Sequence, residues 1–113
     1  MKLNRLSFAL GFLFLSAALV AQTQTETPAS GLTDNPVYKK DCASCHGKTA
    51  EGRHFGGPSL ISDKVAGAPS DHLRDLITNG KGRMPSYAGK LTSDKIDLLV
   101  QQIQAANNAA SKK

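Results

Sequence analysis

The chain has 113 residues and a formal net charge of +5, with 14 basic and 9 acidic residues. This length allows one domain of ordinary size and no more. Lys2 and Arg5 account for two of the 14 basic residues, so the rest of the chain carries a net charge of only +3. No basic stripe is interleaved with aromatic residues, so the composition excludes a cationic protein that binds nucleic acid.

The first 21 residues have the pattern of a cleaved secretory signal peptide. Two basic residues precede an apolar run over residues 6–20, and small residues near its end allow cleavage after Ala18 or after Ala21. This run is shorter than the ~20 apolar residues that a membrane-spanning helix needs. We therefore expect a periplasmic or otherwise exported protein, with a membrane association only if the signal is uncleaved.

Residues 22–34 are rich in Thr, Gln, Pro and Ser, and they show no hydrophobic periodicity. They predict a flexible lead-in to a single domain over residues 35–106. The first helix should begin at Asn35, a favourable N-cap residue. Pro36 then occupies the first helical position, where its missing N–H costs nothing.

This helix leads into residues 42–46, which read Cys-Ala-Ser-Cys-His. Residues three apart lie on one face of a helical turn, so Cys42 and Cys45 can both point at the edge of a porphyrin and add to its vinyl groups. His46 follows at the position that can ligate the iron. We therefore predict one haem c, attached covalently through the two cysteines, with His46 as the first axial ligand.

Other chemistries of these cysteines fit the sequence less well. A disulfide between Cys42 and Cys45 would close a very small and strained loop. Zinc would need four ligands, and beyond the cysteines the chain offers only three histidines at irregular spacings. A thiol–disulfide oxidoreductase of the thioredoxin kind needs a βαβ context, and no buried strand precedes Cys42. The oxidoreductase is kept as the weaker alternative.

Residues 47–69 form a long irregular stretch rich in glycine, which favours a loop that wraps a cofactor. A second helix is expected from Ser70, its predicted N-cap, to a stop at residues 79–80, with one apolar face. That face consists of Leu73, Leu76 and Ile77. His54 in the loop and His72 on the helix are expected to be surface histidines rather than ligands.

Met84 is the only methionine besides Met1. A methionine that fills space in a core usually lies on an apolar helix face. Met84 instead lies in a glycine-rich loop between Arg83 and Pro85, and the proline fixes the backbone beside it. This setting suits the presentation of a thioether to a metal. We predict Met84 as the second axial ligand, opposite His46.

The last helix should begin at Thr92 and bury one apolar face. Its members are Ile96, Leu99, Val100 and Ile103. The periodicity ends at Asn107, so residues 107–113 predict a frayed tail. No stretch is typical of a strand, and the sequence therefore predicts an all-α domain of three main helices with long loops around one haem.

These motifs, in this order, resemble a small monohaem class I cytochrome c. The similarity covers almost everything over residues 35–106. It rests on the Cys42–His46 motif, the Gly-Pro-Ser-Leu block at residues 57–60, the Arg-Met-Pro-Ser-Tyr block at residues 83–87, and the two later helices. The expected fold is therefore a class I cytochrome c-like fold.

The resemblance also implies roles for residues outside the central motif. Pro58 would accept a hydrogen bond from the ring of the proximal His46, which fixes the tautomer and raises the basicity of the ligand. Leu60 and Tyr87 would join Pro58 among the cofactor-binding residues.

The resemblance implies an exported one-electron carrier rather than an enzyme. Its partners would be redox proteins that donate and accept the electron. The chain would be a monomer that binds them in transient complexes. Charges beside the cysteine motif and the methionine loop are expected to steer an acidic partner: Lys48, Lys81, Arg83 and Lys90. The alternative function is a haem enzyme or gas sensor with a labile sixth ligand. A permanently bound Met84 would argue against this alternative.

Overall fold

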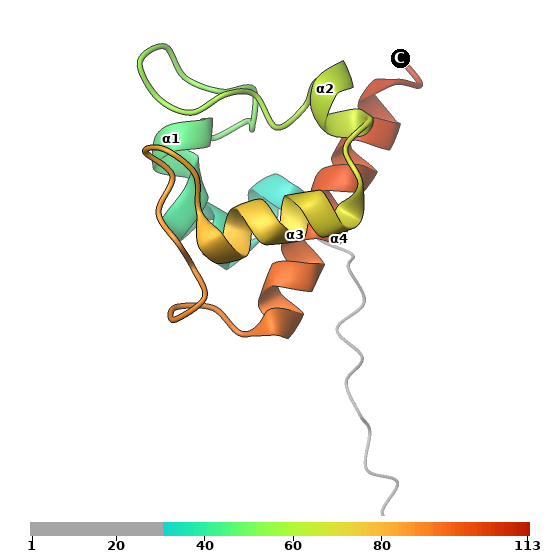
Figure 1. The fold of residues 1–113 in the computed structure, drawn as a ribbon. Coiled ribbons are helices and arrows are strands. Elements are labelled where there is room, and N and C mark those ends of the chain that lie inside the picture. Colours follow the sequence, from blue (N-terminus) through green and yellow to red (C-terminus); the bar gives the residue numbers. More distant parts are fainter. Residues whose placement is uncertain (1–30) are drawn as a thin grey trace, which may run out of the picture.

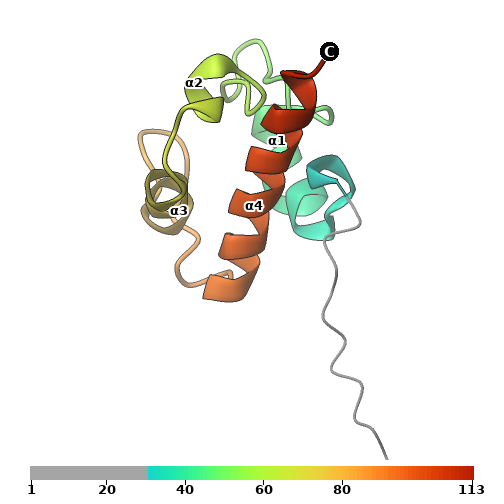
Figure 2. The ribbon, with the colours of Figure 1, turned by 90° about the vertical axis from the view of Figure 1, so that its right-hand side faces the viewer.

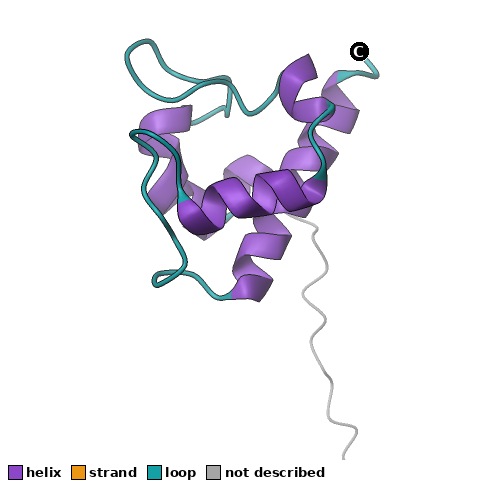
Figure 3. Cartoon of the chain, in the orientation of Figure 1, coloured by secondary structure: helices purple, strands orange, loops and turns teal. Residues whose placement is uncertain are grey.

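The computed structural model describes residues 31–113, and the expected signal peptide and most of the lead-in lie outside the described residues. Within residues 31–113 the elements are helices joined by loops, with no strand (Figure 3). One isolated antiparallel bridge pairs Lys81 with Met84. The expectation of an all-α domain is confirmed. No helix in this part of the chain is long and apolar enough to cross a membrane.

The first long helix starts as predicted. Asn35 caps it, because its side-chain oxygen accepts a hydrogen bond from the N–H of Val37 at 2.8 Å. The helix then passes through a π-helical turn, η2 (Tyr38–Cys42), into α1 (Ala43–His46). Such wide turns are rare and often mark functional sites. Here the wide turn contains the first cysteine of the motif.

The end of the predicted lead-in is ordered. Residues Leu32–Asp34 form a 3-10 turn, η1, and Leu32 is only 3% exposed. This turn packs against α4 (Ser93–Ala110). The expectation of a flexible segment is therefore wrong for residues 32–34, because a single buried leucine holds this polar stretch against the domain.

The long loop after α1 contains a short helix, α2 (Asp63–Ala66), that is absent from the sequence-based expectation. Ser62 caps it, accepting from the N–H of Val65 at 3.4 Å. Because this helix has only one turn, it is too short to show an apolar periodicity in the sequence. Figure 1 shows the rest of this loop extending away from the helices above α1.

The second predicted helix is α3 (Ser70–Asn79), which begins one residue earlier than expected, because Pro69 and not Ser70 is the N-cap. It ends at Gly80, as the sequence predicts. Leu73 and Ile77 are buried, whereas Leu76 is half-buried. Most of the predicted apolar face therefore points into the core.

The last helix, α4, is the centre of the fold. Thr92 caps it and accepts from the N–H of Lys95 at 3.4 Å. The predicted buried face is confirmed for all its members: Ile96, Leu99, Val100 and Ile103. The helix contacts η1, α2 and α3, and Figure 2 shows it standing between α3 on one side and the segment from η1 to α1 on the other. One core is thus shared by all the helices.

The helix α4 also continues beyond the point where the sequence predicts a frayed tail. Asn107 is 4% exposed, and its side-chain amide donates to the carbonyls of Leu60 and Ile103, each at 2.8 Å. Its side-chain oxygen accepts from the N–H of Ser62 at 2.9 Å. The tail prediction is therefore wrong as far as Ala110, because a buried polar anchor extends the inner face of the helix.

Replacing Asn107 with leucine should lower the free energy of unfolding by about 1–3 kcal/mol, because the backbone groups of Leu60 and Ser62 lose their partner. Asn108→Leu is the matched control, since Asn108 is exposed on the same turn. The control should change stability by less than about 0.5 kcal/mol. Urea denaturation of both variants measures the difference. Equal stabilities would contradict the anchoring role.

Candidate haem site

Cys42 and Cys45 lie at the end of the first helix, and neither is in a disulfide. Cys42 is half-buried and Cys45 is exposed. Burial, together with the nearby charge of Asp41 and the neighbouring Cys45, raises the pKa of the Cys42 thiol to about 11. A dithiol oxidoreductase needs a thiol whose pKa is lowered. The structure therefore speaks against the thiol–disulfide alternative.

A zinc site is also unsupported. Among the described residues, no group of three or more His, Cys, Asp or Glu side chains could hold a metal ion. His54 and His72 are both exposed, as the sequence predicts. Neither histidine therefore joins the cysteines in a closed cluster.

The ring of His46 is held by the loop that follows it. Its Nδ1 lies 2.8 Å from the carbonyl oxygen of Pro58, the contact that the resemblance implies. A carbonyl can only accept, so Nδ1 carries the proton and the lone pair of Nε2 is left for a metal. Gly57 permits this approach, since a Cβ at that position would lie 3.0 Å from the imidazole.

The same loop binds the carbonyl groups at the end of the motif helix. Gly57 donates its N–H to the Cys45 carbonyl at 2.7 Å, and Gly52 donates to the His46 carbonyl at 2.8 Å. The guanidinium of Arg53 donates to the Ser44 carbonyl at 2.6 Å. These bonds satisfy helix-end carbonyls that have no partner within the helix. Arg53 was not identified from the sequence, where it is one charge in an irregular loop.

The segment that contains Pro58 is itself anchored at a second point. Leu60 donates its N–H to the carbonyl of Ala50 at 2.8 Å and accepts from Asn107 of α4. Asn107 thus helps to position the carbonyl that orients His46. The sequence offered one signal for this role, because Asn107 follows the buried Ile103 by four residues, one helical turn further along the same face.

Met84 lies in a tight turn whose ends are bonded to each other. Lys81 and Met84 exchange two backbone hydrogen bonds, at 3.1 and 3.0 Å. Gly80 makes the turn possible: its φ is +74°, and a Cβ there would lie 2.5 Å from the Met84 carbonyl oxygen. The Met84 side chain is half-buried and packs against the core. Its thioether is therefore carried by a fixed backbone.

Tyr87 connects this methionine loop to the motif helix. It is 7% exposed, and its hydroxyl donates to the carbonyl of Asp41 at 2.8 Å. Its N–H donates to the carbonyl of Ile77 in α3 at 3.1 Å. Burial raises the pKa of the Tyr87 phenol, so the hydroxyl stays a donor at neutral pH. The loop of Met84 and the residue before Cys42 are thereby tied together.

The donor set fits a haem c. It comprises two thiols outside any disulfide, an imidazole with one nitrogen already fixed, and a half-buried thioether. Apolar side chains of the loops and α2 also pack on the core while keeping part of their surface uncovered: Leu60, Ile61, Val65, Ala68 and Leu91. A large apolar prosthetic group is of the kind that covers such surface.

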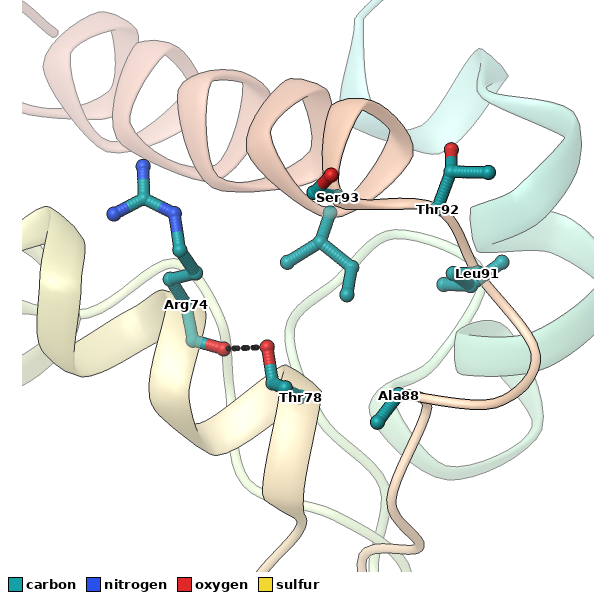
Figure 4. A pocket seen from close by; sticks show the side chains of 7 residues that line it. Arg74, Thr78, Ala88, Leu91, Thr92 and Ser93 are labelled. Carbon is teal, nitrogen blue, oxygen red and sulfur yellow. Dashed lines mark hydrogen bonds between the residues drawn. The ribbon is translucent and has the colours of Figure 1, made fainter.

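A separate hollow of about 580 Å³ lies between α3 and the start of α4 (Figure 4). It is lined by Arg74, Thr78, Ala88, Leu91, Thr92, Ser93 and Ile96. The guanidinium of Arg74 is already paired with Asp71 and Asp97. None of the predicted site residues lines this hollow, although Leu91 belongs both to its lining and to the partly uncovered apolar surface.

Comparisons with known proteins identify the family of the chain. The family model described as cytochrome c oxidase, cbb3-type, subunit III, matches residues 33–103. Cytochrome c55X of Stutzerimonas stutzeri is 34% identical over 103 residues, which are 88% of this chain and 87% of that protein. Cytochrome c-551 of Bacillus subtilis (strain 168) is 36% identical over 64 residues, which are 56% of this chain and 54% of that protein.

A solved structure gives the same result at the level of the fold. The c-type cytochrome NirC superposes with a TM-score of 0.55 at 31% identity, over 66% of this chain and 85% of that one. The family model covers more than half of this chain. The relatives that the chain matches are named as cytochromes c or as subunits of cbb3-type cytochrome c oxidases. The chain therefore belongs to the cytochrome c family, with a class I cytochrome c fold and one covalently bound haem c.

Proposed function

We propose that this chain is an exported one-electron carrier whose haem c is bound through Cys42 and Cys45, with His46 and Met84 as axial ligands. The observation that carries the proposal is the 2.8 Å hydrogen bond between the His46 ring and the Pro58 carbonyl. Haem c supplies a reversible Fe(II)/Fe(III) couple. The residues of the chain then have to bind and orient the haem and shield its iron from water, and none has to react with a substrate.

The role of His46 follows from its fixed tautomer. The Pro58 carbonyl holds the proton on Nδ1 and so raises the basicity of Nε2, the nitrogen that would bind iron. The Leu60 and Asn107 contacts keep this carbonyl in place. The imidazole therefore needs no rearrangement to act as a ligand.

The role of Met84 follows from its neutral side chain and its fixed turn. A thioether adds no charge, and a half-buried position limits the access of water. Both effects favour the less charged Fe(II) state and raise the reduction potential. A methionine held by two backbone hydrogen bonds also favours a permanent ligand over the labile one that an enzyme or gas sensor needs.

The proposed location rests on the signal-peptide pattern of residues 1–21. The partners are redox proteins that give and take one electron. A monomer with a net charge of only +3 after the signal would meet them in transient complexes.

If Cys42 and Cys45 both form thioether bonds, haem will stay with the polypeptide through denaturation and acid–organic extraction. Replacing both cysteines with alanine should make the haem extractable. Ser44→Ala, at the exposed residue between them, is the control and should leave the attachment intact. The visible spectrum of the extracted polypeptide measures the outcome. Free haem from the unaltered protein would overturn the proposal.

Met84→Ala should abolish any sulfur-to-iron absorption band of the oxidised protein, because the thioether is lost. The reduction potential should fall, and small exogenous ligands should bind at the open position. His54→Ala and His72→Ala serve as controls, since both histidines are exposed, and should leave the spectrum unchanged. Visible spectroscopy and redox titration give the readouts. A band that survives Met84→Ala would show that methionine is not the ligand.

A further inference from the structure

Among the described residues, Phe55 is the one large apolar side chain that is exposed, with 89% of its surface accessible. A single exposed apolar residue is ordinary on a protein surface. The backbone of Phe55 is not ordinary. Its φ is +65°, in the left-handed region that aromatic residues rarely adopt.

The turn around Phe55 maintains this conformation. Gly56 donates its N–H to the Arg53 carbonyl at 2.9 Å, and Arg53 donates its own N–H to the Gly57 carbonyl at 3.1 Å. A strained residue persists only where its surroundings determine it, and such residues cluster at functional sites. The chain therefore holds the ring outward in a closed turn at residues 53–57, which we call the Phe55 turn.

The Phe55 turn is fastened to the cysteine motif at two points. The guanidinium of Arg53 donates to the Ser44 carbonyl at 2.6 Å, and Gly57 donates to the Cys45 carbonyl at 2.7 Å. The exposed ring is thus carried by a rigid turn beside the second cysteine. A haem c attached through Cys42 and Cys45 would be bound at this end of the motif helix.

The ring of Phe55 is also restrained sideways. The His54 ring contacts it edge to face, with 4.1 Å between the ring centroids and 67° between their planes. A side chain that is already held in place loses less conformational entropy when a partner covers it. Aromatic residues in pre-organised positions are typical of the residues that dominate interface affinity.

The charged side chains in the segment around this ring are two cations, Lys48 and Arg53, and the carboxylate of Glu51. Lys48 and Arg53 are exposed, and neither takes part in an ion pair between described residues. The nearby Glu51 carboxylate accepts a hydrogen bond from Thr49 at 3.1 Å. An aromatic centre with two cations beside it is complementary to an apolar pocket that has carboxylates at its rim.

We propose that the Phe55 turn is the docking element of this cytochrome, and that Phe55 inserts into an apolar pocket of its redox partner protein. Carboxylates at the rim of that pocket face Lys48 and Arg53. This inference rests on the proposed electron-carrier function and names the surface through which it operates. Docking there brings the partner against the Cys45 end of the motif.

The test uses the haem-loaded protein, with membranes of the source organism as the supply of redox partner proteins. Phe55→Ala should slow electron exchange with these membranes about tenfold or more at dilute protein, the loss typical of a truncated interface anchor. Phe55→Leu retains apolar bulk and should keep most of the rate. His72→Ala, which removes another exposed ring, on α3, is the matched control and should exchange electrons at the unaltered rate.

Exchange with ferricyanide, which is too small to need the pocket, should be the same for all variants. An unchanged membrane rate for Phe55→Ala would overturn the docking role, as would an equal loss with ferricyanide. An unaltered protein that reacts with ferricyanide but not with membranes would overturn the carrier function itself. Rising ionic strength should slow the unaltered protein with membranes, because salt screens Lys48 and Arg53. A membrane rate independent of salt would remove the carboxylate rim from the proposal.

Discussion

The hydrogen bond from the His46 ring to the Pro58 carbonyl is the contact on which the candidate site depends. It decides which imidazole nitrogen carries the proton, and so which nitrogen can bind a metal. The bond also constrains the loop, because a Cβ at residue 57 would lie 3.0 Å from the ring, and glycine avoids that crowding. The same loop also donates hydrogen bonds to the carbonyl groups at the end of the motif helix, those of Ser44, Cys45 and His46.

The loop that contacts His46 and the loop that contains Met84 are each fixed to a different helix. Asn107 of α4 holds the segment after Pro58, whereas Tyr87 holds the methionine loop against Asp41. Both anchors are polar groups buried with their partners, so losing one partner leaves the other unsatisfied. This arrangement gives long loops a rigidity that their glycine-rich sequences do not suggest.

Local patterns predicted much of this structure. The Asn35 and Thr92 caps, the stop at Gly80 and the inner face of α4 each depend on neighbouring residues, and all are present. The cysteine motif and Met84 were likewise recognisable, because spacing and loop context are local features of the sequence. The axial and attachment roles of these residues stay predictions.

What the sequence did not predict depends on contacts between distant segments. Leu32 is ordered only because α4 covers it, and Asn107 bonds a loop more than forty positions earlier in the chain. The exposed Phe55 could not be recognised either, since composition and periodicity say nothing of a backbone φ. The polar side chain of Asn107 suggests the end of a helix, although its spacing from Ile103 continues the buried face.

The raised pKa of Cys42 affects the chemistry of the apoprotein before haem is attached. With a pKa of about 11, roughly one Cys42 thiol in ten thousand is ionised at pH 7. Since only the thiolate attacks sulfur or peroxide, this cysteine resists oxidation even though Cys45 beside it is exposed. In the apoprotein the Cys42 sulfur is therefore kept reduced, which is the state that thioether formation requires.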